Sequence, residues 1–196
     1  MARRIVIIQG HPDPAGHHLC HALADAYAKG AEAAGHEVAR IEVAQLDFPL
    51  LRTKQEFYDG VLPGALKPAQ EAIGAADHLV IIYPLWLGSM PALLKAFFEQ
   101  AFRPGFAFDA LNSSNGKWTQ LLKGKSARII VTMGMPALIY RWYFGAHGLK
   151  SLERNILGFC GIGPIKESLF GLIEAANDLK RQEWLKKMAD LGRAGT

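Results

Sequence analysis

The stretch GHPDPAGHH, residues 10–18, carries residue types suited to binding an anion. Gly10 and Gly16 let the backbone turn closely around a ligand. The stretch also stands directly before a predicted helix, whose first N–H groups and dipole attract negative charge. His11 or His18 can add a side-chain donor. A solvent-exposed turn rich in proline and glycine explains the same residues, so the choice depends on where the loop lies in the fold.

Other kinds of site are disfavoured by spacing. His17 and His21 stand four residues apart, as two ligands of a metal ion would, but no third ligand accompanies them, and we predict no metal site. The first loop lacks the GxGxxG pattern of dinucleotide-binding dehydrogenases. The segment GKSA at 124–127 precedes a predicted strand instead of following one, so it is not a Walker A loop.

Trp86 and Gly88 lie in a loop between two apolar segments of YPLWLGSMPALLKAFFEQAF, residues 83–102. Trp86 offers an aromatic surface, and Gly88 permits a positive φ or a close approach of the backbone. Ser89 and Pro91 predict the start of the next helix, with Ser89 as its N-cap and Pro91 just inside. A helix start does not account for Trp86 or Gly88, which indicates a second role for the loop.

Apolar runs alternate with helical patterns along the whole chain. Strands are predicted at 3–10, 36–43, 77–85, 126–134 and 162–170, and helices at 17–35, 65–76, 92–102, 146–159 and 174–191. Continuous apolar strands that alternate with helices predict a parallel sheet covered on both faces. We therefore predict an α/β fold, a single flavodoxin-like domain over 1–196. It would be a three-layer sandwich around a five-stranded parallel sheet of order 2-1-3-4-5.

This strand order predicts the position of the site. The order reverses between the first and third strands, and ligands of such sheets bind beyond the carboxyl ends of the strands at that point. The loops 10–18, 84–91 and 132–140 meet there, which favours anion binding by the first loop. The connection RPGFAFDALNSSNGKW at 103–118 is long for a compact domain, and such loops are usually functional or lie at an interface.

The composition narrows the class of protein. The 196 residues are 50% hydrophobic, which suits one domain with a substantial core. The formal charge of +4 is carried by scattered basic residues, so we predict no nucleic-acid partner and favour a small anionic ligand. Cys20 and Cys160 have the spacing of ordinary thiols in a reducing compartment. No apolar run has the length of a membrane span or a signal segment, and we predict a cytoplasmic protein without membrane insertion.

Four segments of the chain match one known family. They are GHPDP after the first strand, YPLWLGSMPALLKAFFEQAFRPGFAF, VTMG followed by Tyr140, and HGLKSLERNILGFCG at 147–161. In these segments the chain resembles the flavin-dependent NAD(P)H:quinone oxidoreductases, the group of DT-diaphorase and the modulator of drug activity B proteins. The resemblance covers nearly the whole chain.

The resemblance implies a bound flavin and assigns residues to it. The implied cofactor residues are His11, His18, Leu19 and Cys20 at the phosphate, Pro84, Leu85, Trp86 and Leu87 along the isoalloxazine ring, and Thr132, Met133 and Gly134 at its pyrimidine edge. The implied catalytic residues are Tyr140 and His147, which would donate hydrogen bonds or a proton to the substrate.

A flat, largely apolar ring with one polar edge needs a wall and a few backbone donors. Backbone N–H groups of Trp86 and Leu87 are the candidate donors toward N5 and O4 of the ring. Those near Met133 and Gly134 are the candidates for N1 and O2, where reduction places negative charge.

The implied activity is hydride transfer from NADPH or NADH to FMN or FAD and then to a quinone, with both substrates using one site in turn. The compact phosphate loop favours FMN over FAD. The resemblance also implies a homodimer, with the helix at 92–102 and the connection at 103–118 as its interface. Two alternatives stay open: a non-catalytic electron carrier, which should be acidic, and a regulatory flavoprotein subunit of a membrane transporter.

Overall fold

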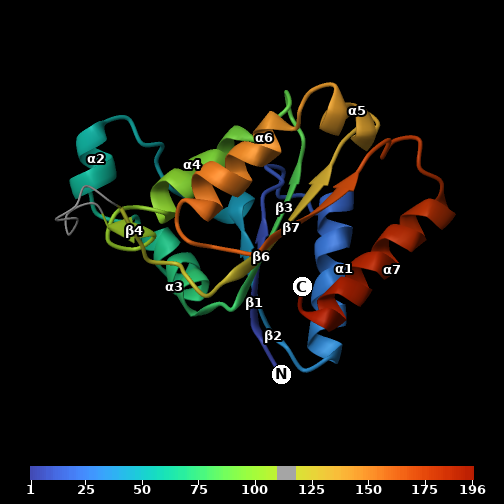
Figure 1. The fold of residues 1–196 in the computed structure, drawn as a ribbon, viewed down its shortest axis with the longest axis horizontal. Coiled ribbons are helices and arrows are strands. Elements are labelled where there is room, and N and C mark those ends of the chain that lie inside the picture. Colours follow the sequence, from blue (N-terminus) through green and yellow to red (C-terminus); the bar gives the residue numbers. More distant parts are fainter. Residues whose placement is uncertain (110–117) are drawn as a thin grey trace.

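The computed structural model describes residues 1–109 and 118–196, and its main feature is a five-stranded parallel sheet (Figure 1). The strands of this sheet are β1 (Arg4–Gln9), β2 (Glu37–Glu42), β3 (His78–Pro84), β6 (Ser126–Thr132) and β7 (Ile165–Phe170). Their order is β2-β1-β3-β6-β7, and all four pairings are parallel. The predicted order 2-1-3-4-5 is therefore confirmed.

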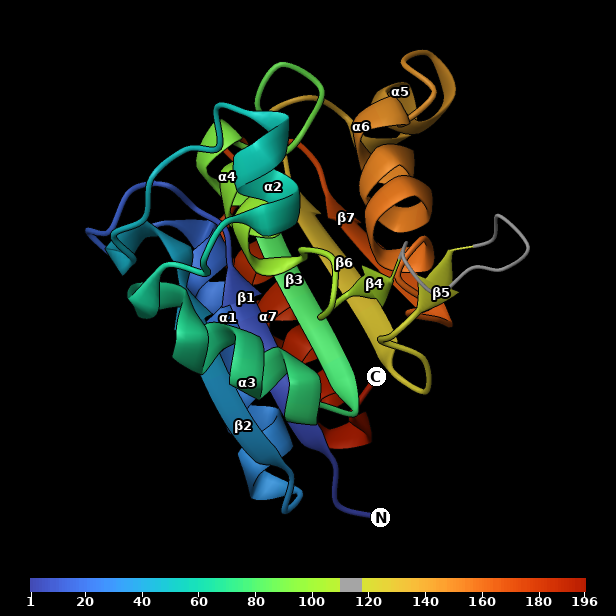
Figure 2. The ribbon, with the colours of Figure 1, turned by 90° about the vertical axis from the view of Figure 1, so that its left-hand side faces the viewer.

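Helices cover both faces of the sheet, as the alternating pattern predicts (Figures 1 and 2). One face carries α1 (Leu19–Ala33) and α7 (Asp178–Ala194). The other carries α3 (Lys67–Ala75), α4 (Ala92–Ala101), and α6 (His147–Lys150) with its π-helical continuation η3 (Ser151–Gly158). In the described ranges, no helix combines the length and the apolar character needed to cross a membrane.

The first strand shows why the central strands carry continuous apolar runs. Ile5 and Ile7 point into the core under α1 and α7, whereas Val6 and Ile8 point into the core under α3 and α4. All four side chains are at most 2% exposed. Because successive side chains of a strand face opposite sides, a strand covered on both faces needs an apolar residue at every position.

The structure adds short elements that the sequence patterns do not predict. They are the helices α2 (Lys54–Asp59) and α5 (Ala137–Trp142), the 3₁₀ turns η1 (Val43–Gln45) and η2 (Gly64–Leu66), and a ribbon of β4 (Phe108–Asp109) with β5 (Thr119–Gln120). The ribbon belongs to the long connection predicted at 103–118, of which 110–117 lie outside the described residues.

The predicted N-cap role of Ser89 is wrong. Helix α4 begins at Ala92, Pro91 occupies the N-cap position, and no side chain caps the helix. The backbone of Ser89 is engaged in a tight turn with Trp86 instead. The turn therefore ends before the helix starts, and Pro91 alone sets the direction of the chain into α4.

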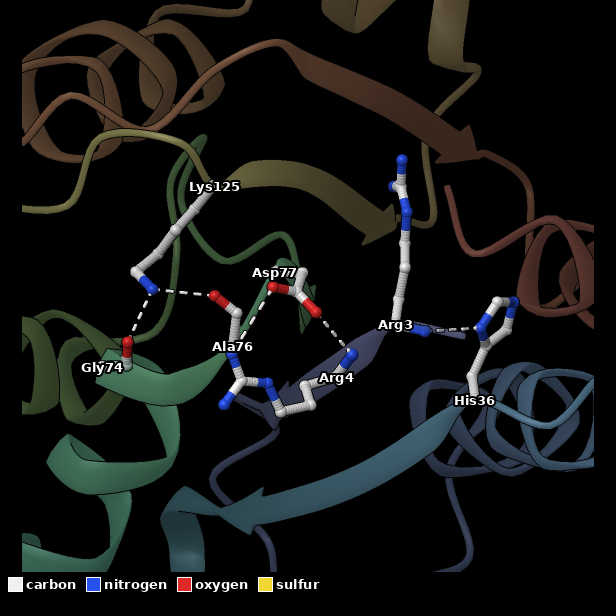
Figure 3. Close-up of polar contacts among 7 residues, drawn as sticks. All are labelled: Arg3, Arg4, His36, Gly74, Ala76, Asp77 and Lys125. Atoms are coloured by element: carbon white, nitrogen blue, oxygen red, sulfur yellow. Dashed lines mark hydrogen bonds and ion pairs between the residues drawn. The ribbon is translucent and has the colours of Figure 1, made fainter. Parts of the chain in front are cut away.

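The amino ends of the strands are closed by polar contacts within the protein (Figure 3). The backbone N–H of Arg4 donates to Asp77 Oδ2 at 2.8 Å, and that of Arg3 donates to His36 Nδ1 at 3.1 Å. Lys125 Nζ donates to the carbonyls of Gly74 and Ala76, each at 2.7 Å. These polar groups at the amino edge of the sheet are thus engaged in contacts within the protein.

Candidate functional site at the carboxyl edge of the sheet

Backbone hydrogen bonds hold the three predicted loops together at the carboxyl ends of β1, β3 and β6. The N–H of Gly10 donates to the carbonyl of Ile82 at 2.7 Å, and the N–H of Leu85 donates to the carbonyl of Thr132 at 2.8 Å. The loops that follow these strands therefore start from fixed positions beside one another. This is the topological switch point of the sheet, where β1 has β2 on one side and β3 on the other.

Among the described residues, no backbone acceptor pairs with the N–H groups of Leu19 and Cys20 at the start of α1. His18 occupies the N-cap position with extended backbone, its side chain makes no cap hydrogen bond, and no acidic residue lies in the first turn. The first N–H groups of a helix have no partner within the helix, so those of Leu19 and Cys20 point out of α1. An anion is the natural acceptor for such groups.

The rings of His11 and His18 stack beside this helix end, with their centroids 3.8 Å apart. The carboxylate of Asp13 accepts from His18 Nε2 at 2.7 Å, and the N–H of Asp13 donates to His11 Nδ1 at 3.2 Å. Burial lowers the pKa of His11, and the neighbouring imidazole of His18 lowers it further. Asp13 acts in the opposite direction on this pKa, and the net effect disfavours the protonated form of His11 beside the first N–H groups of α1.

Cys20 contributes to this region through its backbone and not through a reactive thiol. Its side chain is 1% exposed, and its Sγ lies 3.2 Å from Thr132 Oγ1. Burial raises the pKa of the thiol to about 12. The contact joins the first turn of α1 to the end of β6, so Cys20 and Thr132 hold two of the predicted cofactor loops in register.

Trp86 and Ser89 close a two-residue turn by a pair of hydrogen bonds. Trp86 N donates to Ser89 O at 2.9 Å, and Ser89 N donates to Trp86 O at 3.0 Å. Leu87 and Gly88, between them, have φ of 46° and 80°, the positive values of a type I′ turn. Trp86 is 52% exposed and Leu87 is 107% exposed, so the turn projects from the end of β3 as an open wall.

Two backbone donors proposed for the flavin ring are already in use. The N–H of Trp86 bonds within the turn, and the N–H of Met133 donates to the carbonyl of Phe170 at 2.8 Å. Their assignment as flavin donors is therefore wrong, because turn and sheet pairing take them. The N–H groups of Leu87 and Gly134 have no backbone acceptor within the described ranges and remain candidates.

The two predicted catalytic residues differ in exposure. Tyr140 is 1% exposed, and its hydroxyl donates to the carbonyl of Gly88 at 3.3 Å and accepts from the N–H of Leu149 at 3.1 Å. His147 is exposed at the first residue of α6, with its ring against Gly145. Their contact with a substrate stays a prediction, to which the structure adds a bond from Tyr140 to the Trp86–Ser89 turn.

Gly148 is a site residue that the sequence reasoning missed. A Cβ atom at this position would lie 2.2 Å from the carbonyl oxygen of Gly88 and 2.7 Å from Ser89 Cα. Only glycine permits α6 to approach the turn this closely. No local pattern of the sequence signals the contact, because it forms between segments about sixty residues apart.

These observations fit a phosphorylated flavin. The helix end and its imidazoles supply donors for a phosphate, the projecting Trp86–Ser89 turn supplies a wall for a flat ring, and Leu87 and Gly134 supply free N–H groups for the polar edge of that ring. Buried donors without partners point the same way, since the side-chain nitrogen of Gln9 at the end of β1 has none among the described residues. In the described ranges, no group of three or more His, Cys, Asp or Glu side chains is arranged so that it could hold a metal ion.

Known proteins resemble this chain in sequence and in fold. The family described as flavodoxin-like fold matches residues 3–191. An uncharacterised NAD(P)H oxidoreductase of Haemophilus influenzae is 28% identical over 141 residues, which are 71% of this chain and 68% of that protein. An FMN-dependent NADH:quinone oxidoreductase of Pseudomonas fluorescens is 34% identical over 97 residues, which are 45% of this chain and 43% of that enzyme.

Among solved structures, that of Smu.1420 from Streptococcus mutans UA159 has a TM-score of 0.81 and 26% identity, and the match covers 97% of this chain and 98% of that one. Several curated relatives are longer than the region they share with this chain, which spans 58% to 68% of their length.

Proposed function

Because this chain belongs to the flavodoxin-like fold family, we propose that it is a flavin-dependent oxidoreductase that transfers a hydride from NADPH or NADH to a quinone. The observation that carries the proposal is the adjacency of an anion site and an open wall. The ring of His11, beside the free end of α1, meets the ring of Trp86 edge to face at a centroid distance of 6.3 Å. A molecule with a phosphate at one end and a flat ring at the other fits this arrangement.

The residues of the chain would bind and orient the cofactor. The N–H groups of Leu19 and Cys20 and the ring of His11 would hold the phosphate, as the resemblance implies. The ring would lie along Pro84–Leu87, with the N–H of Leu87 and that of Gly134 as donors to its polar edge. When bound, a flavin supplies a ring that accepts a hydride from one substrate and gives it to another.

His147 and Tyr140 would then have separate tasks. His147 is exposed beside the wall, where an imidazole N–H can donate to a quinone oxygen as negative charge develops on it. The hydroxyl of Tyr140 is bonded to the backbone on both sides, so Tyr140 would act as a positioning residue that holds the Trp86–Ser89 turn. This division of tasks refines the prediction from the resemblance, in which both side chains face the substrate.

We propose FMN as the cofactor and a homodimer as the assembly. The FMN-dependent relative and the compact phosphate loop support FMN over FAD. The dimer is supported by an aromatic hollow of about 300 Å³ between α4 and η3, lined in part by Phe108, Trp118 and Phe159, because such apolar surface is commonly covered by a partner. Sedimentation at several protein concentrations tests the assembly. We also propose that the protein acts in the cytoplasm.

Absorbance spectroscopy tests the activity directly. The purified chain is mixed with FMN or FAD, freed of excess flavin, reduced with NADPH or NADH without oxygen, and then given a quinone. We expect a yellow protein that bleaches with the nicotinamide and recovers its colour with the quinone. A chain that retains neither flavin contradicts the proposal.

The same assay separates the alternatives. A protein that binds flavin but is bleached by no nicotinamide would be an electron carrier. One that turns over slowly and co-purifies with a membrane transporter would be a regulatory subunit. Neither alternative has a specific feature of the described residues in its favour.

A further inference from the structure

Three imidazoles gather at the N-terminus of α1. The rings of His11 and His18 are stacked. The centroid of the His21 ring lies 5.4 Å from that of His11 and 5.8 Å from that of His18. His11 and His21 are only 7% and 8% exposed. Neither the resemblance nor the loop pattern assigns His21 to the phosphate.

One ring nitrogen of the cluster has no partner among the described residues. Nδ1 of His21 is buried and has no hydrogen-bond partner in the described ranges, which is uncommon for a buried polar atom. The helix end beside it is uncapped and lacks an acidic residue in its first turn. These are two independent signs that an acceptor from outside the chain belongs here.

The charges that face the cluster come from four elements. Asp13 of the loop bonds to His18, and Asp25 of α1 and Glu42 of β2 lie near His21. Arg40 of β2 pairs with both Asp25, at 2.5 Å, and Glu42, at 3.2 Å. The charges of that group therefore largely offset one another. Arg181 of α7 lines a hollow of about 300 Å³ together with His17 and His18.

Without a ligand the cluster disfavours protonation. Burial lowers the pKa of His11 and of His21, and the imidazole of His18 lowers both further. Asp13 acts in the opposite direction on His11, and Glu42 and Asp25 do so on His21. Two positive rings stacked at 3.8 Å would repel each other. A phosphate monoester carries between one and two negative charges near neutral pH, and it would reverse this balance.

We propose that His11, His18 and His21 form a proton-linked binding site for the flavin phosphate, in which at least one imidazole takes up a proton when the phosphate binds. The inference deepens the proposed function and depends on it. Affinity for the phosphate then increases as the pH falls, because each proton taken up changes the dissociation constant by about tenfold per pH unit in the range where the free site is neutral.

Comparing two flavins isolates the phosphate. Dissociation constants of FMN and of riboflavin, which lacks the phosphate, are measured by flavin fluorescence from pH 6.5 to 8.5. Riboflavin 5′-sulfate, whose charge is constant over this range, controls for titration of the phosphate itself. We expect the ratio of the riboflavin constant to the FMN constant to increase by about tenfold per pH unit towards the acid side for one linked proton. The sulfate ester should show the same trend.

Calorimetry in two buffers of different ionisation enthalpy counts the protons directly. We expect uptake of about one proton or more per FMN at pH 7.5. The variants H18Q and H21Q should each reduce both the uptake and the slope. His18 is half-buried, so H18Q keeps the test decisive if H21Q does not fold. H36Q, at the opposite edge of the sheet (Figure 3), is the matched control and should change neither.

The outcomes are distinguishable. Tight FMN binding with a flat ratio and no proton uptake overturns the linked site and leaves the proposed function intact. An unchanged slope in both H18Q and H21Q overturns the assignment to these histidines. Absence of binding by every flavin overturns the proposed function and this inference together.

Discussion

Replacing Gly148 by alanine tests whether the approach of α6 to the Trp86–Ser89 turn shapes the flavin site. The added Cβ would meet Gly88 O at 2.2 Å and Ser89 Cα at 2.7 Å, whereas ordinary contacts of this kind begin near 3.4 Å. One of the two segments must therefore move by about 1 Å. Both contact atoms belong to backbone, so rotation of a side chain cannot relieve the overlap.

Two effects of this substitution have opposite signs. Alanine favours helix over glycine by about 1 kcal/mol, which would stabilise α6. Overpacking costs about 1–3 kcal/mol, and the turn can escape it only by leaving the position that lines the ring. If FMN binding must return the turn to that position, the overpacking cost is taken from the binding free energy. The dissociation constant of FMN should then increase by roughly 10-fold to 100-fold.

Fluorescence titration with FMN and with riboflavin measures the effect. We expect G148A to weaken both by a similar factor, because the displaced turn contacts the ring and not the phosphate. G64A is the matched control, since a Cβ on Gly64 has no heavy atom of another segment within 4 Å. If G148A binds FMN as tightly as the native chain does, the turn does not form the flavin wall.

Three further predictions concern buried groups. Y140F should lower the free energy of unfolding by about 1–3 kcal/mol, because the buried N–H of Leu149 loses its acceptor. Urea unfolding measures this change, and Y143F, at the exposed Tyr143, is the control. Equal losses in the two variants would contradict a stabilising role of the Tyr140 hydrogen bond. Cys20, whose pKa burial raises to about 12, and the other buried cysteine should resist a thiol reagent at pH 8 until denaturant is added, and rapid labelling of the native protein would refute this. Burial lowers the pKa of His78 from 6.5 to about 4, so from pH 7 to 4 the unfolded chain binds a proton there before the folded protein does, and stability should fall by about 3 kcal/mol. Unfolding curves at several pH values should show a smaller fall for H78L.

The sequence predicts the layers of this fold well because the signal is repeated along each element. The strands Arg4–Gln9, His78–Pro84 and Ser126–Thr132 carry the uninterrupted apolar runs IVII, LVII and IIV, which are typical of strands covered on both faces. Short elements carry weaker signals. Helix α2 begins with Thr53 accepting from the N–H of Glu56, a Thr-x-x-Glu start that the sequence displays and that could have revealed it.

The availability of backbone donors could not be predicted from residue types. Trp86 N–H and Met133 N–H are used because of the register of a turn and of a parallel ladder, which depend on segments far away in the chain. The residue types also do not reveal the turn, because Leu87 takes a positive φ of 46°, a conformation in which Asn or Gly is usual. A non-glycine residue held in this conformation is a strained position of the kind that gathers at functional sites.

The two halves of the candidate site depend on opposite faces of the sheet. The phosphate end is fixed through Cys20, which belongs to the core under α1 and α7, whereas the wall is held by Tyr140, which belongs to the core under α3 and α4. The edge contact of His11 with Trp86 is the ring contact that joins them in the described ranges. A substitution in one core should therefore act mainly on one end of the cofactor, since sites without shared partners respond nearly additively. For this reason the comparison of FMN with riboflavin can separate a defect in the wall, which weakens both ligands, from a defect in the histidine cluster, which weakens FMN alone.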